Sequence, residues 1–160
     1  MPLHVTLRMA PHVYNLRSRR SFRVIAAALR IGGDRFNVRV IQFSVQGNHI
    51  HLVVEAPNRR ALARAIQGLS IRVAKGLNRM MGRSGRVFDD RYHARALRTP
   101  TEVRHAIHYV LDNARKHAAQ RGATYSPSYV DPYSSAGAPD LALPSAQTWL
   151  LRTSGKRSGP

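Results

Sequence analysis

Hydrophobic and polar residues alternate with two distinct periods along the first 122 residues of the chain. A period of two, typical of strands with one buried face, occurs in four short segments. A repeat of three and four residues, typical of amphipathic helices, occurs in three longer segments. Strands are therefore expected at residues 4–10, 37–46, 49–54 and 92–97, and helices at residues 18–33, 58–82 and 99–122.

Residues with strong capping preferences stand where the predicted helices begin. Ser18 or Ser21 can cap the first helix, and Pro57-Asn58 opens the second. Thr99 precedes the third helix, with Glu102 three residues later, which is the spacing of a capping box. The second helix has one apolar stripe, formed by Leu62, Ile66, Leu69, Val73, Leu77 and Met80.

The order of these elements predicts the fold class. Strand, helix, strand, strand, helix and strand form the β-α-β-β-α-β arrangement of an α+β, ferredoxin-like (RRM-like) four-stranded antiparallel sheet. Both helices of that motif cover one face of the sheet, so the third helix is an addition that is free to lie near the open face. Residues 1–122 are expected to form this domain. Residues 123–160, rich in Pro, Ser and Gly, are expected to form an extended or disordered tail.

The net charge of the chain indicates which kind of molecule it binds. The chain has 26 Lys and Arg against 8 Asp and Glu, a net charge of +18. Such a positive field attracts polyanions, and nucleic acid is the commonest polyanion in a cell. The absence of Cys excludes disulfides and thiolate metal sites. No apolar run is long enough for a membrane helix, so we expect a cytoplasmic, nucleoid-associated protein.

Two histidines in the third predicted strand are candidate metal ligands. His49 and His51 flank Ile50, and side chains two apart in a strand lie on the same face, roughly 7 Å apart. Two neutral imidazoles so placed can chelate a divalent ion. Any His-x-His pair taken alone is more often simply exposed on a sheet face.

Tyr109 in the third predicted helix is the candidate nucleophile. The apolar stripe expected there is Val103, Ile107, Val110, Leu111 and Ala114. Tyr109 lies off that stripe, on a face expected to include His105, Asn113 and Lys116. A tyrosine oxygen can attack a phosphodiester and form a phosphotyrosine link while a divalent metal offsets the developing charge. The amide of Asn113 can supply the metal with an oxygen ligand.

These motifs together resemble those of the single-tyrosine HUH transposases, and most closely the REP-associated tyrosine transposases of bacteria. The similar segments are Gly47-Asn48-His49-Ile50-His51-Leu52-Val53-Val54, Phe88-Asp89-Asp90-Arg91-Tyr92-His93 and Tyr109-Val110-Leu111-Asp112-Asn113. The resemblance covers residues 3 to 122. It implies a ferredoxin-like fold, a divalent metal (Mg²⁺ or Mn²⁺) held by the two histidines, and a 5′-phosphotyrosine intermediate on single-stranded DNA. It also implies recognition of hairpins formed by repetitive extragenic palindromes.

One residue departs from the family pattern. Many relatives have proline after the asparagine, where this chain has Ala114. Proline kinks a helix, so a straighter helix is expected here. The sequence leaves open whether the site is built within one chain or across a homodimer.

Positively charged and aromatic side chains outside the histidine strand are candidate DNA contacts. They are Arg64, Arg72, Lys75 and Arg79 of the second helix, Arg91 and Tyr92 before the fourth strand, and Lys116 beyond Tyr109. The alternative function is a non-catalytic module that binds single-stranded nucleic acid on an RRM-like sheet. Such modules stack bases on strand aromatics, of which the predicted open face has few. A basic structural protein of the ribosome or nucleoid would explain the charge but not Tyr109.

Overall fold

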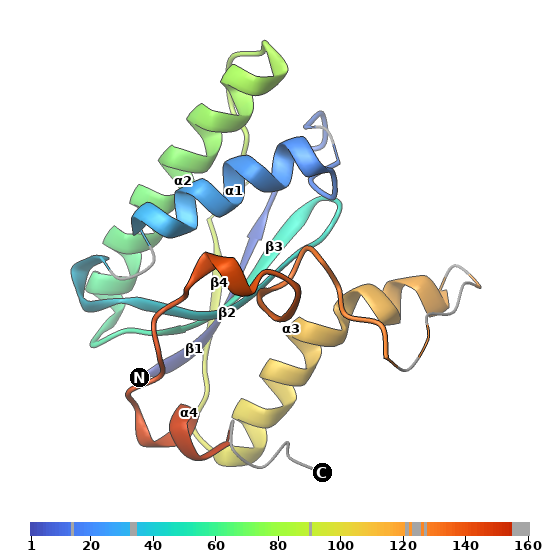
Figure 1. The fold of residues 1–160 in the computed structure, drawn as a ribbon. Helices are drawn as coiled ribbons and strands as arrows, with labels where there is room; N and C mark the ends of the chain where they lie inside the picture. Colours follow the sequence, from blue (N-terminus) through green and yellow to red (C-terminus); the bar gives the residue numbers. More distant parts are fainter. Residues whose placement is uncertain are drawn as a thin grey trace.

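A four-stranded antiparallel sheet forms the centre of the molecule (Figure 1). The computed structural model describes residues 1–13, 15–32, 35–89, 91–120, 122, 126 and 128–154, without the side chain of His117. The strands are β1 (Pro2–Arg8), β2 (Arg39–Val45), β3 (His49–Glu55) and β4 (His93–Ala96). Their spatial order is β2-β3-β1-β4, so β1 and β3 occupy the middle of the sheet. This arrangement confirms the predicted ferredoxin-like fold.

Helices cover both faces of the sheet. Helices α1 (Arg19–Gly32) and α2 (Arg59–Met81) pack together on one face, and α3 (Pro100–Gln120) and the short α4 (Trp149–Ser154) lie on the other (Figure 1). The expectation that the third long helix lies near the open face is confirmed. It buries part of that face, because α3 contacts both β2 and β3.

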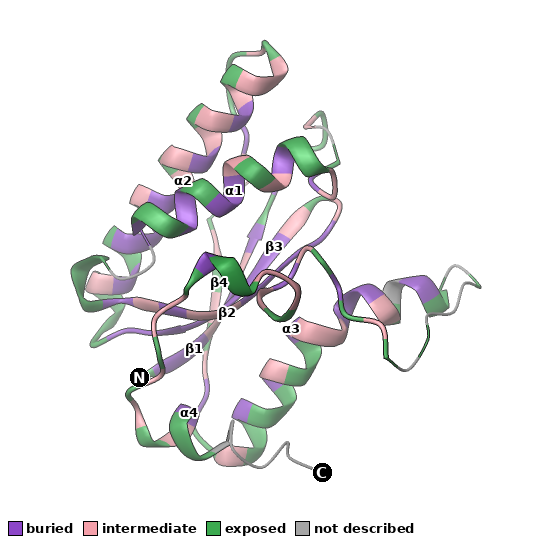
Figure 2. Cartoon of the chain, viewed as in Figure 1, coloured by how far each residue is buried: buried purple, intermediate pink, exposed green. Residues whose placement is uncertain are grey.

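Alternation along β3 divides its side chains between the two helix layers. Ile50, Leu52 and Val54 join the large core under α1 and α2, whereas Val53 joins the smaller core under α3. Figure 2 shows β3 as buried over most of its length. On β2, a bulge between Val40 and Gln42 breaks the alternation, and Ile41 is turned toward the α3 side.

Side-chain hydrogen bonds cap the beginnings of the three long helices. The Ser21 N–H donates to Ser18 Oγ at 3.1 Å, and the Ala61 N–H donates to Asn58 Oδ1 at 2.8 Å. Thr99 and Glu102 form the predicted capping box through reciprocal bonds of 3.1 and 3.3 Å. Helix α2 ends where Gly82 adopts a left-handed conformation with φ 64°. The predicted bounds of β1 and β4 are off by one or two residues, and Gly33 lies outside the described residues.

Residues 128–154 lie along the sheet and include the short helices η2 (Ser135–Gly137) and η3 (Pro139–Leu141). Ser134 bridges to Ser44 of β2, and the Val45 N–H donates to the Tyr133 carbonyl at 2.8 Å. These contacts cover the exposed edge of β2, which would otherwise present unpaired backbone groups. A bidentate pair between Arg17 and buried Asp131 ties the same segment to the start of α1. The part of the predicted tail that the structure describes therefore packs on the sheet.

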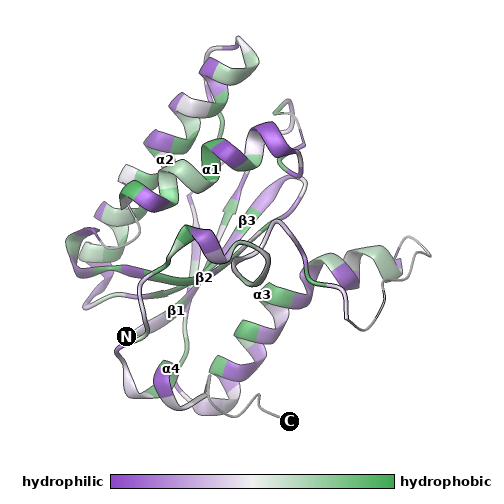
Figure 3. Ribbon diagram, viewed as in Figure 1, coloured by the Kyte–Doolittle hydropathy of each residue, from purple (hydrophilic) through white to green (hydrophobic). Residues whose placement is uncertain are grey.

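Hydropathy differs between the inner and outer faces of the helices. Figure 3 shows hydrophobic and hydrophilic residues interleaved along α2 and α3. Within the described residues, no helix is both long enough and apolar enough to cross a membrane.

Glu55 is a buried carboxylate that joins the end of β3 to the C-terminal segment. It pairs with Arg39 at 2.8 Å and accepts hydrogen bonds from the Gln147 N–H and from the N–H and hydroxyl of Thr148. Burial by itself raises the pKa of Glu55, but the bonds from Thr148, Gln147 and Arg39 outweigh burial and lower the pKa below its ordinary value. Glu55 therefore acts as a structural carboxylate that ties β3 to Arg39 and to residues 147 and 148.

A Glu55→Gln variant should be less stable than the native protein by roughly 3 kcal/mol at neutral pH, because a buried ion pair loses one partner. The lowered pKa means that this contribution is complete above the ordinary value of 4.5 and is lost as pH falls through the folded value. Thermal melts from pH 7 to pH 3 should therefore converge at low pH. Asp140→Asn, at an exposed carboxylate, is the control. Parallel curves for Glu55→Gln and native protein would contradict the assignment.

Candidate functional site

The two histidines of β3 lie beside the nucleophile candidate of α3. The ring centroids of His49 and His51 are 4.7 Å apart, and those of His51 and Tyr109 are 5.2 Å apart. Both pairs have edge-to-face geometry. The structure thus brings together side chains separated by nearly sixty residues of sequence.

A hydrogen bond orients His49. Its Nδ1 lies 2.7 Å from Oδ1 of Asn48, and because an amide oxygen can only accept, Nδ1 carries the proton. In the neutral ring the lone pair is then on Nε2, the form in which imidazole ligates a metal. Asn48 therefore acts as a positioning residue, a role that sequence reasoning did not assign.

His4 of β1 is a third histidine of the site. The strand register pairs Thr6 with His51, and His4 is two residues away on the same face. His4 Nε2 lies 3.1 Å from His51 Nδ1, and its ring centroid lies 5.7 Å from that of Tyr109. Burial, and secondarily the positive charge of Arg95, lower the pKa of His4 and favour its neutral form. The sequence did not indicate His4 as part of the site, because the register of β1 against β3 is not visible in either segment.

Tyr109 stands at the edge of the buried face of α3. Val103, Ala106 and Val110 are the residues that pack into the smaller core, so the tyrosine lies off the stripe as expected. Its side chain remains 39% exposed, and Lys116 Nζ lies 5.1 Å from its ring centroid. An exposed phenol flanked by imidazoles and an ammonium group can approach an anionic substrate.

The predicted stripe of α3 was partly wrong. Ile107 and Leu111 are only half-buried, and Ala106 replaces them at the centre of the contact. Asn113, expected on the polar face with Tyr109, is instead buried at 1% exposure. The face buried by α3 is therefore rotated relative to the most hydrophobic stripe.

The buried amide of Asn113 suits a metal ligand. Neither its Oδ1 nor its Nδ2 has a hydrogen-bond partner among the described residues, and an unsatisfied buried amide is costly. Within the part of the chain that the structure describes, no three His, Cys, Asp or Glu side chains gather as a metal site. The residues that the sequence predicts as ligands of a divalent ion are His49, His51 and Asn113, a donor set that Mn²⁺ tolerates.

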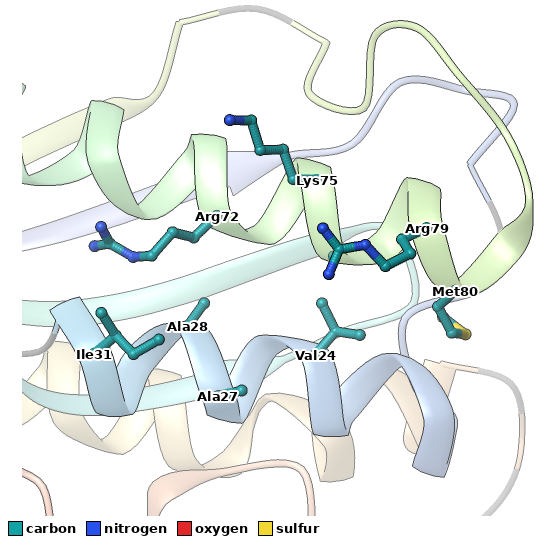
Figure 4. A pocket seen from close by; sticks show the side chains of 9 residues that line it. Val24, Ala27, Ala28, Ile31, Arg72, Lys75, Arg79 and Met80 are labelled. Atoms are coloured by element: carbon teal, nitrogen blue, oxygen red, sulfur yellow. The ribbon is translucent and has the colours of Figure 1, made fainter.

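The basic residues of α2 lie on the opposite side of the sheet. Figure 4 shows Arg72, Lys75 and Arg79 along a groove of about 490 Å³ between α1 and α2. Arg72 is wedged against the end of α1, since a Cβ at Gly32 would come within 2.0 Å of its guanidinium. Arg64 stacks on Phe36, 5.3 Å from the ring centroid. None of the four is brought to the histidine site.

The surroundings differ among the remaining candidate DNA contacts, which are Arg91, Tyr92 and Lys116. Arg91 is exposed before β4, whereas Tyr92 packs partly into the large core and is therefore turned away from solvent. Lys116 alone lies against Tyr109. Asp90, in the second motif, lies outside the described residues.

The sequence model of the IS200-like transposases matches residues 19–113, more than half of the chain, and the chain belongs to that family of transposases. The matched region includes the histidine pair, Tyr109 and Asn113. No curated protein sequence matches the chain.

Two solved structures share the fold. One is a REP-associated tyrosine transposase bound to a REP hairpin, with a TM-score of 0.62 and 15% identity over 84% of this chain and 75% of that one. The other is a candidate transposase from Deinococcus radiodurans R1, with a TM-score of 0.51 and 10% identity over 78% of this chain and 92% of that one. At these identities the likeness establishes a common fold.

An Asn113→Leu variant should be more stable than the native protein in the absence of metal, by about 1 kcal/mol, because it removes an unsatisfied buried amide. It should also lose any rise in melting temperature on addition of Mn²⁺. Denaturant unfolding with and without Mn²⁺ measures both effects. Asn78→Leu is the matched control, since the Asn78 amide is hydrogen-bonded to Gly85 and Arg83 and its loss should destabilise. A destabilised Asn113→Leu would show that the amide is already satisfied.

Proposed function

We propose that this transposase cleaves and rejoins single-stranded, hairpin-bearing DNA, with Tyr109 as nucleophile and a divalent metal bound by His49, His51 and Asn113. The observation that carries the proposal is the contact of the Tyr109 ring with His51, at 5.2 Å between centroids. A phenol beside a pair of metal-capable imidazoles, in a chain of net charge +18, matches the requirements of phosphodiester attack.

The cleavage step exchanges one phosphate ester for another. The Tyr109 oxygen attacks the phosphorus, the bond from phosphorus to the 3′ oxygen breaks, and a 5′-phosphotyrosine forms. The phenolic proton leaves to solvent, to which the side chain is exposed, and the departing 3′ oxygen takes up a proton. A second DNA end can later attack the same phosphorus and release the tyrosine, so joining needs no ATP.

The metal, when bound, polarises a phosphate oxygen and offsets the charge that develops on the phosphate. The protein groups have complementary tasks. Asn48 holds His49 in the tautomer suited to ligation, and His4 and Thr6 contact His51 Nδ1 at 3.1 and 3.3 Å. Each imidazole is therefore oriented by a neighbour before substrate arrives.

The non-catalytic binding module is the weaker alternative. An RRM-like module stacks bases on aromatic side chains of an open sheet face. Here Phe43 of β2 is fully buried on the opposite side, stacked on Phe22 of α1. Helix α3 covers much of the face such a module would use.

DNA hairpins are the proposed partner, in keeping with the REP hairpin bound by the structurally similar transposase. A depression of about 500 Å³ along the outer face of α3, which includes Tyr109, Lys116 and His105, offers a path for the single strand at the nucleophile. Lys116 and Arg91 are proposed to contact phosphates. The basic groove of α2 is proposed to contribute mainly through its long-range field, because it lies behind the sheet.

Tyr109→Phe should abolish the covalent protein–DNA adduct and strand cleavage while hairpin binding persists. The change removes only the hydroxyl, so the fold should be unaffected within about 1.5 kcal/mol. Denaturing gels after incubation with hairpin-bearing single-stranded DNA and Mn²⁺ detect the adduct, and gel shifts measure binding. Tyr92→Phe is the control and should retain the adduct. An adduct in Tyr109→Phe, or peptide mapping to another tyrosine, would refute the assignment.

A His49→Ala/His51→Ala variant should lose cleavage and calorimetric Mn²⁺ binding, yet bind DNA with nearly native affinity. The native protein should work faster with Mn²⁺ than with Mg²⁺, because imidazole ligands suit Mn²⁺ better. His93→Ala, at an exposed histidine of β4, is the matched control. Equal cleavage by the double variant and the native protein after chelation would exclude the metal role.

A further inference from the structure

A cavity of about 360 Å³ opens beside Tyr109, where β1, β3 and β4 meet α3. The side chains that line it are His4, Thr6, His51, Arg95, His105, Ala106 and Tyr109. None of them is acidic, three are imidazoles and one is a guanidinium. A cavity with this lining, next to a nucleophile, is suited to an anion.

Arg95 reaches the cavity because of the strand register. It pairs with His4 across the β1–β4 ladder, and directly opposed residues of neighbouring strands project from the same face. His4 in turn contacts His51, and its ring lies 5.7 Å from that of Tyr109. Arg95 therefore projects from β4 on the face that also presents the histidines.

The charge of Arg95 is not neutralised by a salt bridge with any described residue. Glu102 is close enough to sense it, but its carboxylate already accepts hydrogen bonds from the N–H groups of Arg98 and Thr99 as part of the α3 cap. A guanidinium that lines a cavity without a carboxylate partner is available to bind a ligand anion. Its planar fork matches two oxygens of one phosphate.

We propose that this cavity seats the scissile phosphate and that Arg95 is its anion-binding residue. The guanidinium donates to the non-bridging oxygens of the phosphate, while the Tyr109 oxygen forms the new bond to phosphorus and the 3′ oxygen leaves with the bond that breaks. Negative charge grows on those non-bridging oxygens during the exchange, so Arg95 stabilises the transition state more than the bound substrate. This role rests on the proposed function and adds a catalytic residue on β4.

The test compares full-length native protein with Arg95→Gln, Arg95→Lys and the control Arg98→Gln. The control removes an equal charge three residues away, outside the cavity lining. Adduct formation should be about 10²- to 10³-fold slower in Arg95→Gln, the usual effect of losing one transition-state donor. Arg95→Lys should be intermediate, because charge remains without the fork. Arg98→Gln should react at the native rate.

A neutral methylphosphonate at the scissile position shows whether Arg95 acts on that phosphate. Without the charge, Arg95 has little to stabilise, so native protein and Arg95→Gln should react at similar rates. The inference is overturned if Arg95→Gln reacts like native protein on the ordinary phosphodiester. It is also overturned if its deficit is the same on the methylphosphonate.

A binding measurement in chelator separates this inference from the proposed chemistry. Native protein and Arg98→Gln should bind hairpin DNA with the phosphodiester about tenfold more tightly than the methylphosphonate DNA, and Arg95→Gln should bind the two equally. If native protein forms no adduct but shows this preference, the cleavage proposal fails, whereas binding of the phosphate in the cavity by Arg95 is supported. If Arg95→Gln and native protein prefer phosphodiester DNA over methylphosphonate DNA equally, Arg95 does not bind the scissile phosphate, whatever the outcome for Tyr109.

Discussion

The docking of α3 onto the sheet is the interaction on which the candidate site depends. Val103, Ala106 and Val110 pack on Val53 and neighbouring side chains, and this contact sets the height and rotation of the helix above β3. The small side chain of Ala106 lies in the middle of the contact and lines the cavity beside Tyr109. With the helix so placed, the Tyr109 ring lies against His51, and Asn113, one turn further along α3, is buried. A shift of one residue in this packing would separate Tyr109 from the histidines.

The same docking buries polar groups that a purely structural interface would avoid. His51 is 4% exposed and Asn113 is 1% exposed, and the Asn113 amide has no partner among the described residues. Such groups cost stability unless a ligand satisfies them. The larger core under α1 and α2 has a continuous apolar composition by comparison, with Phe43, Leu52 and Leu77 almost fully buried. The apolar core on one face of the sheet thus supports a second face on which polar side chains are buried.

Positively charged side chains lie on both faces of the sheet. Those near Tyr109 and those on the far face have different surroundings. Arg95 and Lys116 lie close to Tyr109, the proposed nucleophile. Arg72 and Arg79 line a groove on the far side of the sheet, and Arg72 is committed to packing against the end of α1. Total charge in the sequence therefore indicates a polyanionic partner, but it does not locate the contact surface.

The sequence by itself determined the order and type of the four strands and three long helices, the cap at Thr99, and the pairing of His49 with His51 on one strand face. These features are local, because they depend on periodicity and on residues within a few positions of one another. Tertiary structure decided the rest. The entry of His4 and Arg95 into the site depends on strand register, and the burial of Asn113 depends on how α3 rotates when it docks. Glu55 is buried and hydrogen-bonded because the N–H groups of residues 147 and 148, near the other end of the chain, donate to its carboxylate. Contacts between distant segments are set by packing of the whole molecule, and no local pattern encodes them.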